Sequence, residues 1–194
     1  MKKLSITQKI CVFAGILLLI VAGVVTFLWQ RNLTLSRQQN QIYVQTLRQL
    51  IPEPRGAALE SRSDNTMPVL SLDGTDFVGI LEMPRYGSAL PVCGDWGNLS
   101  QYPCRFSGSV YDGSLRIGST SQPGHYDFFK EISVGDSVYF TDLAGNQYAY
   151  TVTDLRYAKH ADEAAFQRAD GQLTLFIKNV YAFEYLMVFC NTAS

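Results

Sequence analysis

The stretch Leu173-Thr174-Leu175-Phe176-Ile177-Lys178 is an apolar run that ends on a single lysine. Its β-branched and aromatic residues suit a pleated, half-buried surface, so we predict a strand at Leu173–Ile177. Short runs of the same kind, each bounded by Gly, Pro, Asn or Asp, predict further strands at Phe77–Met83, Ala89–Val92, Leu115–Gly118, Ser137–Asp142, Gln147–Tyr157 and Tyr185–Cys190. This spacing is typical of a mainly β protein built as a closed barrel of about seven to eight strands.

The connections between these strands carry their own signals. Leu143-Ala144-Gly145-Asn146 separates two predicted strands, and its Gly-Asn pair favours a tight hairpin with positive φ. Short helices are expected at Tyr126–Ile132 and Asp162–Gln167.

Length and charge restrict the classes of protein that fit. A chain of 194 residues is long enough for one ordinary domain with an accessory segment. Its 16 Lys and Arg residues against 17 Asp and Glu residues give no electrostatic reason to expect a nucleic-acid partner.

The N-terminal region predicts a membrane anchor. Ile10–Trp29 has no charged residue, and at about 1.5 Å per residue it spans roughly the 30 Å of a bilayer core. A cleaved signal peptide is the alternative, but the run is longer than the usual apolar region and lacks an Ala-x-Ala site. Basic residues before the run favour a cytoplasmic N-terminus. The expected segments are a cytoplasmic tail at 1–9, a transmembrane helix at 10–29, a juxtamembrane helix and spacer at 30–72, and an extracellular barrel domain at 73–194.

The chain contains four cysteines, and their expected roles depend on where they lie. Cys11 lies at the inner end of the apolar run, where a small buried side chain is the simplest role. The other three, Cys93, Cys104 and Cys190, would lie in an oxidising environment, where a disulfide can form. Because three is an odd number, at least one of them stays unpaired within the chain.

Several local segments follow one another in a fixed order: Phe77-Val78-Gly79-Ile80-Leu81-Glu82-Met83-Pro84, Leu90-Pro91-Val92, Pro103-Cys104-Arg105-Phe106-Ser107-Gly108-Ser109, Val134-Gly135-Asp136-Ser137-Val138-Tyr139-Phe140-Thr141-Asp142 and Leu173-Thr174-Leu175-Phe176. In order and spacing they resemble the sortases, the surface transpeptidases of Gram-positive bacteria, and are most similar to a class B-like group of clostridial type. The resemblance implies a β-barrel that cleaves a sorting signal through a cysteine thiolate and passes the acyl group to an amine on a cell-wall precursor or pilin.

That chemistry needs a thiolate, a proton donor for the leaving amine and a cation or hydrogen-bond donor for the oxyanion, which the family supplies with Cys, His and Arg. Alignment with the family motifs puts Lys178 at the cysteine position, Thr120 at the histidine position and Tyr185 at the arginine position. A protonated lysine amine is no nucleophile, and a threonine hydroxyl does not titrate near neutral pH. All three catalytic positions are therefore substituted.

Displaced residues offer an alternative, in which His125 acts with Cys190 or Cys104 in an active cysteine transpeptidase. The resemblance also gives Cys104 and Cys190 a structural use, including a disulfide between them, and leaves Cys93 as the unpaired loop thiol. His125 and His160 lack the spacing of metal ligands, so we expect neither a metal nor another cofactor.

The family resemblance and the three substituted catalytic positions lead to one principal hypothesis. In this hypothesis the protein is a membrane-anchored, degenerate transpeptidase that keeps a cleft for an extended sorting-signal peptide or pilin. A third hypothesis is a purely structural domain whose cleft is filled by its own side chains, with Lys178 paired to an acid such as Glu184.

Overall fold

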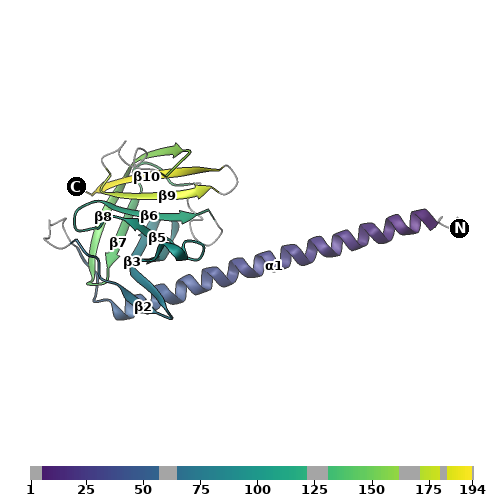
Figure 1. Ribbon diagram of the computed structural model, residues 1–194, viewed down its shortest axis with the longest axis horizontal. Helices are drawn as coiled ribbons and strands as arrows, with labels where there is room; N and C mark the ends of the chain where they lie inside the picture. Colours follow the sequence, from purple (N-terminus) through teal and green to yellow (C-terminus); the bar gives the residue numbers. More distant parts are fainter. Residues whose placement is uncertain (1–5, 57–64, 122–130, 162–170, 180–182, 194) are drawn as a thin grey trace. The chain divides into compact units, whose positions relative to one another are not determined.

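The computed structural model describes residues 6–56, 65–121, 131–161, 171–179 and 183–193 (Figure 1). The chain divides into two compact units, Met1–Ser36 and Arg37–Ser194. The second unit contains every described strand.

Helix α1 runs without a break from Ile6 to Leu50. The expected transmembrane and juxtamembrane helices are therefore parts of one helix. Its segment Phe13–Arg31 has a mean hydropathy of 2.2 and is long and apolar enough to cross a membrane by length and composition. The helix ends just before Pro52, since a residue that precedes proline is pushed out of the helical conformation.

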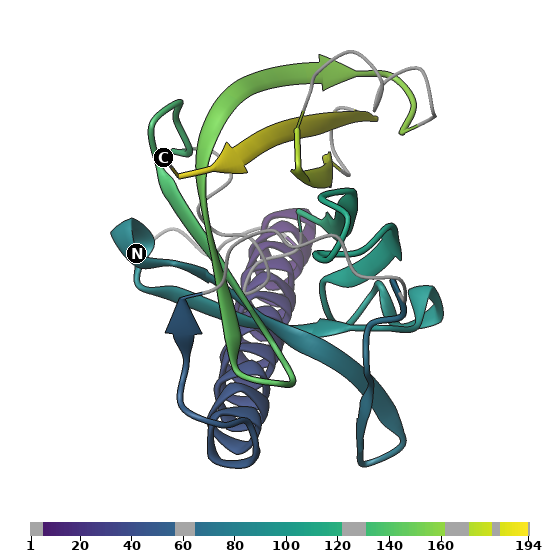
Figure 2. The ribbon, with the colours of Figure 1, turned by 90° about the vertical axis from the view of Figure 1, so that its left-hand side faces the viewer.

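A closed barrel forms the second unit. Among the described residues its ring consists of β3 (Thr75–Met83), β4 (Ser88–Cys93), β5 (Cys104–Ser107), β6 (Leu115–Thr120), β9 (Leu173–Asn179), β10 (Glu184–Thr192), β8 (Asn146–Ala158) and β7 (Ser137–Asp142), which pairs back onto β3. Two short strands lie outside the ring: β1 (Arg55–Gly56) pairs with β8, and β2 (Leu70–Leu72) pairs with β3. Figure 2 shows how the long strand β8 curves so that one end pairs with β7 and the other with β10.

The observed strands confirm the expected mainly β barrel, and the hairpin at Leu143–Asn146 joins β7 to β8 with Gly145 at a φ of 80°. Strand β5 was missed, because Cys104-Arg105-Phe106-Ser107 is short and contains no apolar run. The helix expected at Tyr126–Ile132 falls largely outside the described residues, and the helix expected at Asp162–Gln167 falls wholly outside them.

The apolar residues pack in separate layers on the two sides of the barrel wall. Alternate residues of the strands fill the interior, among them Leu81, Ile117, Phe140, Leu175 and Val188. A second cluster covers the outer face of β3, β4 and β5 with α1 residues 44 and 47, and consists of Val44, Leu47, Ile51, Phe77, Ile80, Cys93, Tyr102 and Cys104. The last turns of α1 are thus part of the domain, although we expected the domain to begin at residue 73.

Candidate functional site

Thr120, Lys178 and Tyr185 lie side by side on three adjacent strands. Thr120 at the end of β6 is the parallel register partner of Lys178 on β9, and Lys178 is the antiparallel partner of Tyr185 on β10. Register partners project to the same face of a sheet. Ile177 is buried in the barrel interior, so Lys178, one residue later, points to the outer face.

The three side chains offer a hydroxyl, an ammonium group and a phenol. Thr120 Oγ1 is buried and has no hydrogen-bond partner among the described residues. Lys178 is exposed, and no ion pair to it is found in the described part of the chain. Glu184, suggested as its partner, is instead in register with Asn179. Tyr185 is half-buried, with its ring centroid 6.4 Å from that of Phe176.

An aromatic cluster on the same face shares Tyr185 with this trio and also contains Trp96, Phe106 and Phe176. Trp96 belongs to the short helix η2 (Trp96–Asn98), whose first turn is capped by the Asp95 carboxylate, which accepts a hydrogen bond from the Gly97 N–H at 2.8 Å. Ring centroids are 5.0 Å apart for Trp96 and Phe106 and 5.4 Å apart for Phe106 and Phe176. Trp96 and Phe106 remain 38% and 44% exposed, so the cluster presents apolar surface to solvent.

The thiols suggested as displaced nucleophiles are not brought to the trio. Cys190 on β10 faces the barrel interior and is completely buried, and burial raises the pKa of its thiol. Cys104 lies in the outer cluster instead, so these two cysteines occupy opposite faces of the wall. His125 lies outside the described residues, and His160 is exposed beyond the end of β8.

Cys104 adjoins Cys93, the predicted unpaired loop thiol, which instead lies at the end of β4. The two are register partners on β4 and β5, and both are completely buried. A hydrogen bond from Cys104 is the main reason that the pKa of Cys93 is lowered to about 6; burial opposes the shift, and the Asp95 N–H and Asn98 Nδ2, at 3.4 and 3.5 Å from Sγ, reinforce it. The same hydrogen bond, together with burial, raises the pKa of Cys104. The sequence did not reveal this pair because β5 was not predicted.

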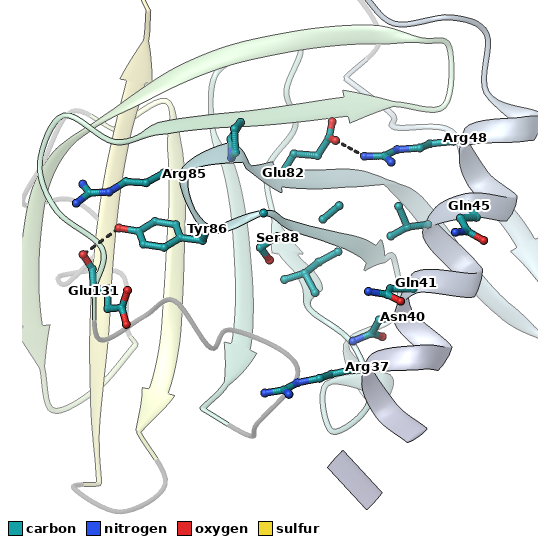
Figure 3. Close-up of a pocket in the computed structure, with 15 residues that line it drawn as sticks. Arg37, Asn40, Gln41, Gln45, Arg48, Glu82, Arg85, Tyr86, Ser88 and Glu131 are labelled. Carbon is teal, nitrogen blue, oxygen red and sulfur yellow. Dashed lines mark hydrogen bonds and ion pairs between the residues drawn. The ribbon is translucent and has the colours of Figure 1, made fainter. Parts of the chain in front are cut away.

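A polar pocket of about 890 Å³ lies elsewhere on the domain, between the last turns of α1 and the segment that joins β3 to β4 (Figure 3). Its lining includes Arg37, Arg48 and Arg85, of which Arg48 is paired with Glu82 and Arg85 with Asp136. None of the trio lines this pocket. Within the described residues, no cluster of three or more His, Cys, Asp or Glu side chains could hold a metal ion.

A network around Asp136 supports one end of this pocket. Tyr86 Oη and the Ser133 N–H donate hydrogen bonds to the Asp136 carboxylate at 2.6 and 2.9 Å, beside the Arg85 guanidinium. Burial alone would raise the pKa of Asp136, but these hydrogen bonds and the positive charge outweigh it and lower the pKa below its ordinary value. The network fixes η1 (Pro84–Tyr86) against the start of β7.

Comparisons with known proteins identify the fold. No protein-family model matches the sequence, and no curated protein matches it. The structure is similar to the sortase D5 transpeptidase of Clostridium perfringens, with a TM-score of 0.52 and 12% identity over 61% of this chain and 80% of that one. It is also similar to sortase A of Listeria monocytogenes, with a TM-score of 0.50 and 18% identity over 61% and 88% of the two chains. For the pilus-related sortase C of Group B Streptococcus the TM-score is 0.52, with 17% identity over 70% and 79%.

The barrel domain therefore has the sortase fold, as the sequence resemblance predicted. These similar structures are sortases A, C and D. Assignment to a class B-like group stays a prediction.

Proposed function

We propose that this chain is a membrane-anchored, sortase-like protein of the Gram-positive cell surface, in which the transpeptidase centre is degenerate but a surface for an extended peptide is kept. The observation that carries the proposal is the register of Thr120, Lys178 and Tyr185. The positions that the sequence alignment matches to the catalytic residues are neighbours in space, which supports the alignment, and they contain neither a thiol nor an imidazole.

The chemistry explains why this trio would not turn over a sorting signal. Transpeptidation passes through a thioester, which an amine can later open. If the Lys178 amine attacked a carbonyl it would form an amide, which an amine acceptor does not resolve. Neither the Thr120 hydroxyl nor the Tyr185 phenol replaces an imidazole as a proton shuttle near neutral pH.

Peptide binding does not need a nucleophile. The outer face beside the trio combines the partly exposed rings of Trp96 and Phe106 with the N–H donors of the exposed Lys178. An extended peptide can place apolar side chains on the rings and its carbonyl groups on the donors. The sortase fold makes a sorting signal or a pilin the first ligand to test.

Attachment to a membrane is the second part of the proposal. The exposed apolar segment Phe13–Arg31 of α1 supports it. Lys2, Lys3 and Lys9 precede this segment, which favours a cytoplasmic N-terminus and an external barrel. The expected role is then in surface-protein or pilus anchoring, as a binding or scaffolding partner.

An active cysteine transpeptidase with displaced residues is the competing hypothesis. Cys190 and Cys104 argue against it, because both thiols are completely buried and both have a raised pKa, whereas a nucleophile needs an accessible thiolate.

The test uses the full-length protein in detergent micelles with fluorescent sorting-signal peptides, with and without an amine acceptor. Fluorescence anisotropy measures binding, and intact-mass spectrometry detects a covalent acyl adduct. We expect binding without an adduct, and weaker binding in Lys178→Ala and Trp96→Ala than in the control Ile42→Ala, whose exposed residue lies on α1. An adduct that disappears with one Cys→Ala change would refute the degenerate centre, and the absence of both signals would favour the structural hypothesis.

A further inference from the structure

Strands β4 and β5 meet at two cysteines. Within the described residues their ladder is the single parallel pair Cys93 and Cys104, with one further backbone hydrogen bond from the Cys93 N–H to the Pro103 carbonyl at 2.8 Å. The neighbouring junction of β6 with β9 extends over six pairs, from Leu115 with Leu173 to Thr120 with Lys178. The β4–β5 junction is therefore a weakly paired seam in the ring.

The geometry of this seam suits a covalent bond. Neighbouring strands lie about 4.7–4.9 Å apart, and Cα atoms in a disulfide are usually about 4.4–6.8 Å apart. Register partners project to the same face, so the two free thiols are neighbours. Both side chains are enclosed by apolar neighbours of the outer cluster, including Tyr102 and Phe77.

We propose that Cys93 and Cys104 form a disulfide that closes the barrel at the β4–β5 seam. The oxidant is an external disulfide, either a small molecule or a protein. Because both cysteines are completely buried in the folded domain, the exchange takes place while the outer cluster is open. The Cys93 thiolate attacks one of the oxidant's sulfur atoms and expels the other as a thiolate, which leaves a mixed disulfide on Cys93. Cys104 then loses its proton, and its sulfur attacks Cys93 Sγ and expels the second thiolate. The protein loses two electrons and two protons, and the oxidant becomes two thiols.

The environment of the pair matches these two roles. Cys93 Sγ accepts hydrogen bonds from the Asp95 N–H and Asn98 Nδ2, which favour its thiolate form. Cys104 keeps its proton and sits beside Cys93 as the resolving thiol. Cys190 has no place in the exchange, because it lies on the opposite face of the barrel wall from Cys93 and Cys104.

The loop that the disulfide would close carries a residue of the candidate site. Residues 94–103 include Trp96, which packs on Phe176 with ring centroids 5.8 Å apart. Oxidation would therefore restrict the loop that holds Trp96 in the aromatic cluster. In the reduced protein that loop is held by non-covalent contacts.

The test uses full-length protein purified in detergent and equilibrated with oxidised glutathione. Free thiols are alkylated in denaturant, and the peptides are mapped by mass spectrometry. We expect a cross-linked peptide containing Cys93 and Cys104, lighter by two hydrogen atoms than the two thiol peptides, while Cys190 is alkylated. Alkylation of both Cys93 and Cys104, or a link from Cys104 to Cys190, would overturn the proposal. Mapping the unaltered chain requires no variant to fold.

Variants test the effect on the fold. Adding a reductant should lower the Tm of the oxidised protein by about 5–10 °C. Cys93→Ser and Cys104→Ser should each abolish both the cross-link and this shift, whereas the control Cys190→Ser should keep both. A shift of the same size in Cys93→Ser would refute the assignment. This outcome is independent of peptide binding, so it can fail while the proposed function stands.

Discussion

Trp96 packs directly on Gly118: a β-carbon added at Gly118 would come within 2.5 Å of Trp96 Cη2 and within 2.6 Å of Phe176 Cζ. Strand β6 thus needs a residue without a side chain where the loop between β4 and β5 folds over it. The aromatic cluster depends on this one position.

We predict that Gly118→Ala displaces the Trp96 ring and destabilises the domain by about 1–3 kcal/mol, because the packed rings have little room to shift. The check is thermal unfolding together with tryptophan fluorescence in a Trp29→Phe background, where a red-shifted emission is expected. Gly56→Ala is the control, since nothing lies within 4 Å of a β-carbon there. An equal decrease in stability in Gly118→Ala and Gly56→Ala would contradict the packing argument.

Ile177 and Lys178 are adjacent residues on opposite faces of β9, so alanine substitutions at the two positions should affect stability differently. Ile177→Ala should cost about 2–5 kcal/mol, because it leaves a cavity in the barrel interior. Lys178→Ala should change the free energy of unfolding by less than about 0.5 kcal/mol, because the side chain is exposed. Denaturant titrations of the two variants measure both values, and a large loss from Lys178→Ala would reveal a structural role for this lysine.

The alternation of apolar residues made most of the fold predictable, since strands such as Ser137–Asp142 appear with the expected bounds. The sequence alignment also grouped Thr120, Lys178 and Tyr185, which are register neighbours on β6, β9 and β10, and their match to the family's catalytic positions stays a prediction. The Cys93–Cys104 pair could not be found in this way, because the short strand β5 contains no apolar run and is not predicted from the sequence. The burial of Leu47 was also not predictable, because the apolar face of a helix such as α1 does not indicate which surface it covers.

The thiol pair predicts a pH profile in the reduced protein. Alkylation of Cys93 requires its thiolate, so the rate should fall as the pH drops through about 6 and stay level above about 7. Site-resolved alkylation by mass spectrometry measures this rate. Removal of the Cys104 hydrogen bond in Cys104→Ala should raise the midpoint towards the ordinary cysteine value of about 8.5, despite the unchanged Asp95 and Asn98 contacts. An unchanged midpoint would show that the hydrogen bond is not the cause.

Asp136 predicts an acid-dependent loss of stability. Its pKa is lowered in the folded state, so its contribution is present above the ordinary carboxyl value of about 3.9 and is lost as the pH falls through the lowered pKa. Asp136→Asn should cost about 1–3 kcal/mol at neutral pH, and the difference from the unaltered protein should shrink in acid. Unfolding curves between neutral and acidic pH provide the check. The exposed Asp76→Asn serves as the control for the removal of a surface carboxylate.

The end of α1 predicts where the folded domain begins. Leu47 is completely buried on the outer face of the barrel, whereas Leu50 is 57% exposed. Leu47→Ala should therefore cost about 2–5 kcal/mol and Leu50→Ala less than about 1 kcal/mol. Thermal unfolding distinguishes the two. Equal stability of these variants would show that the helix contributes nothing to the domain.

The position of β10 in the ring has a consequence for biosynthesis. This strand follows all the others in the chain, yet it lies between β8 and β9 and pairs with both. Until Glu184–Thr192 have been synthesised, β8 and β9 each expose an unpaired edge, and such edges favour aggregation. The nascent domain therefore depends on folding late, and a chain that stops before β10 should be recovered as aggregate or be degraded.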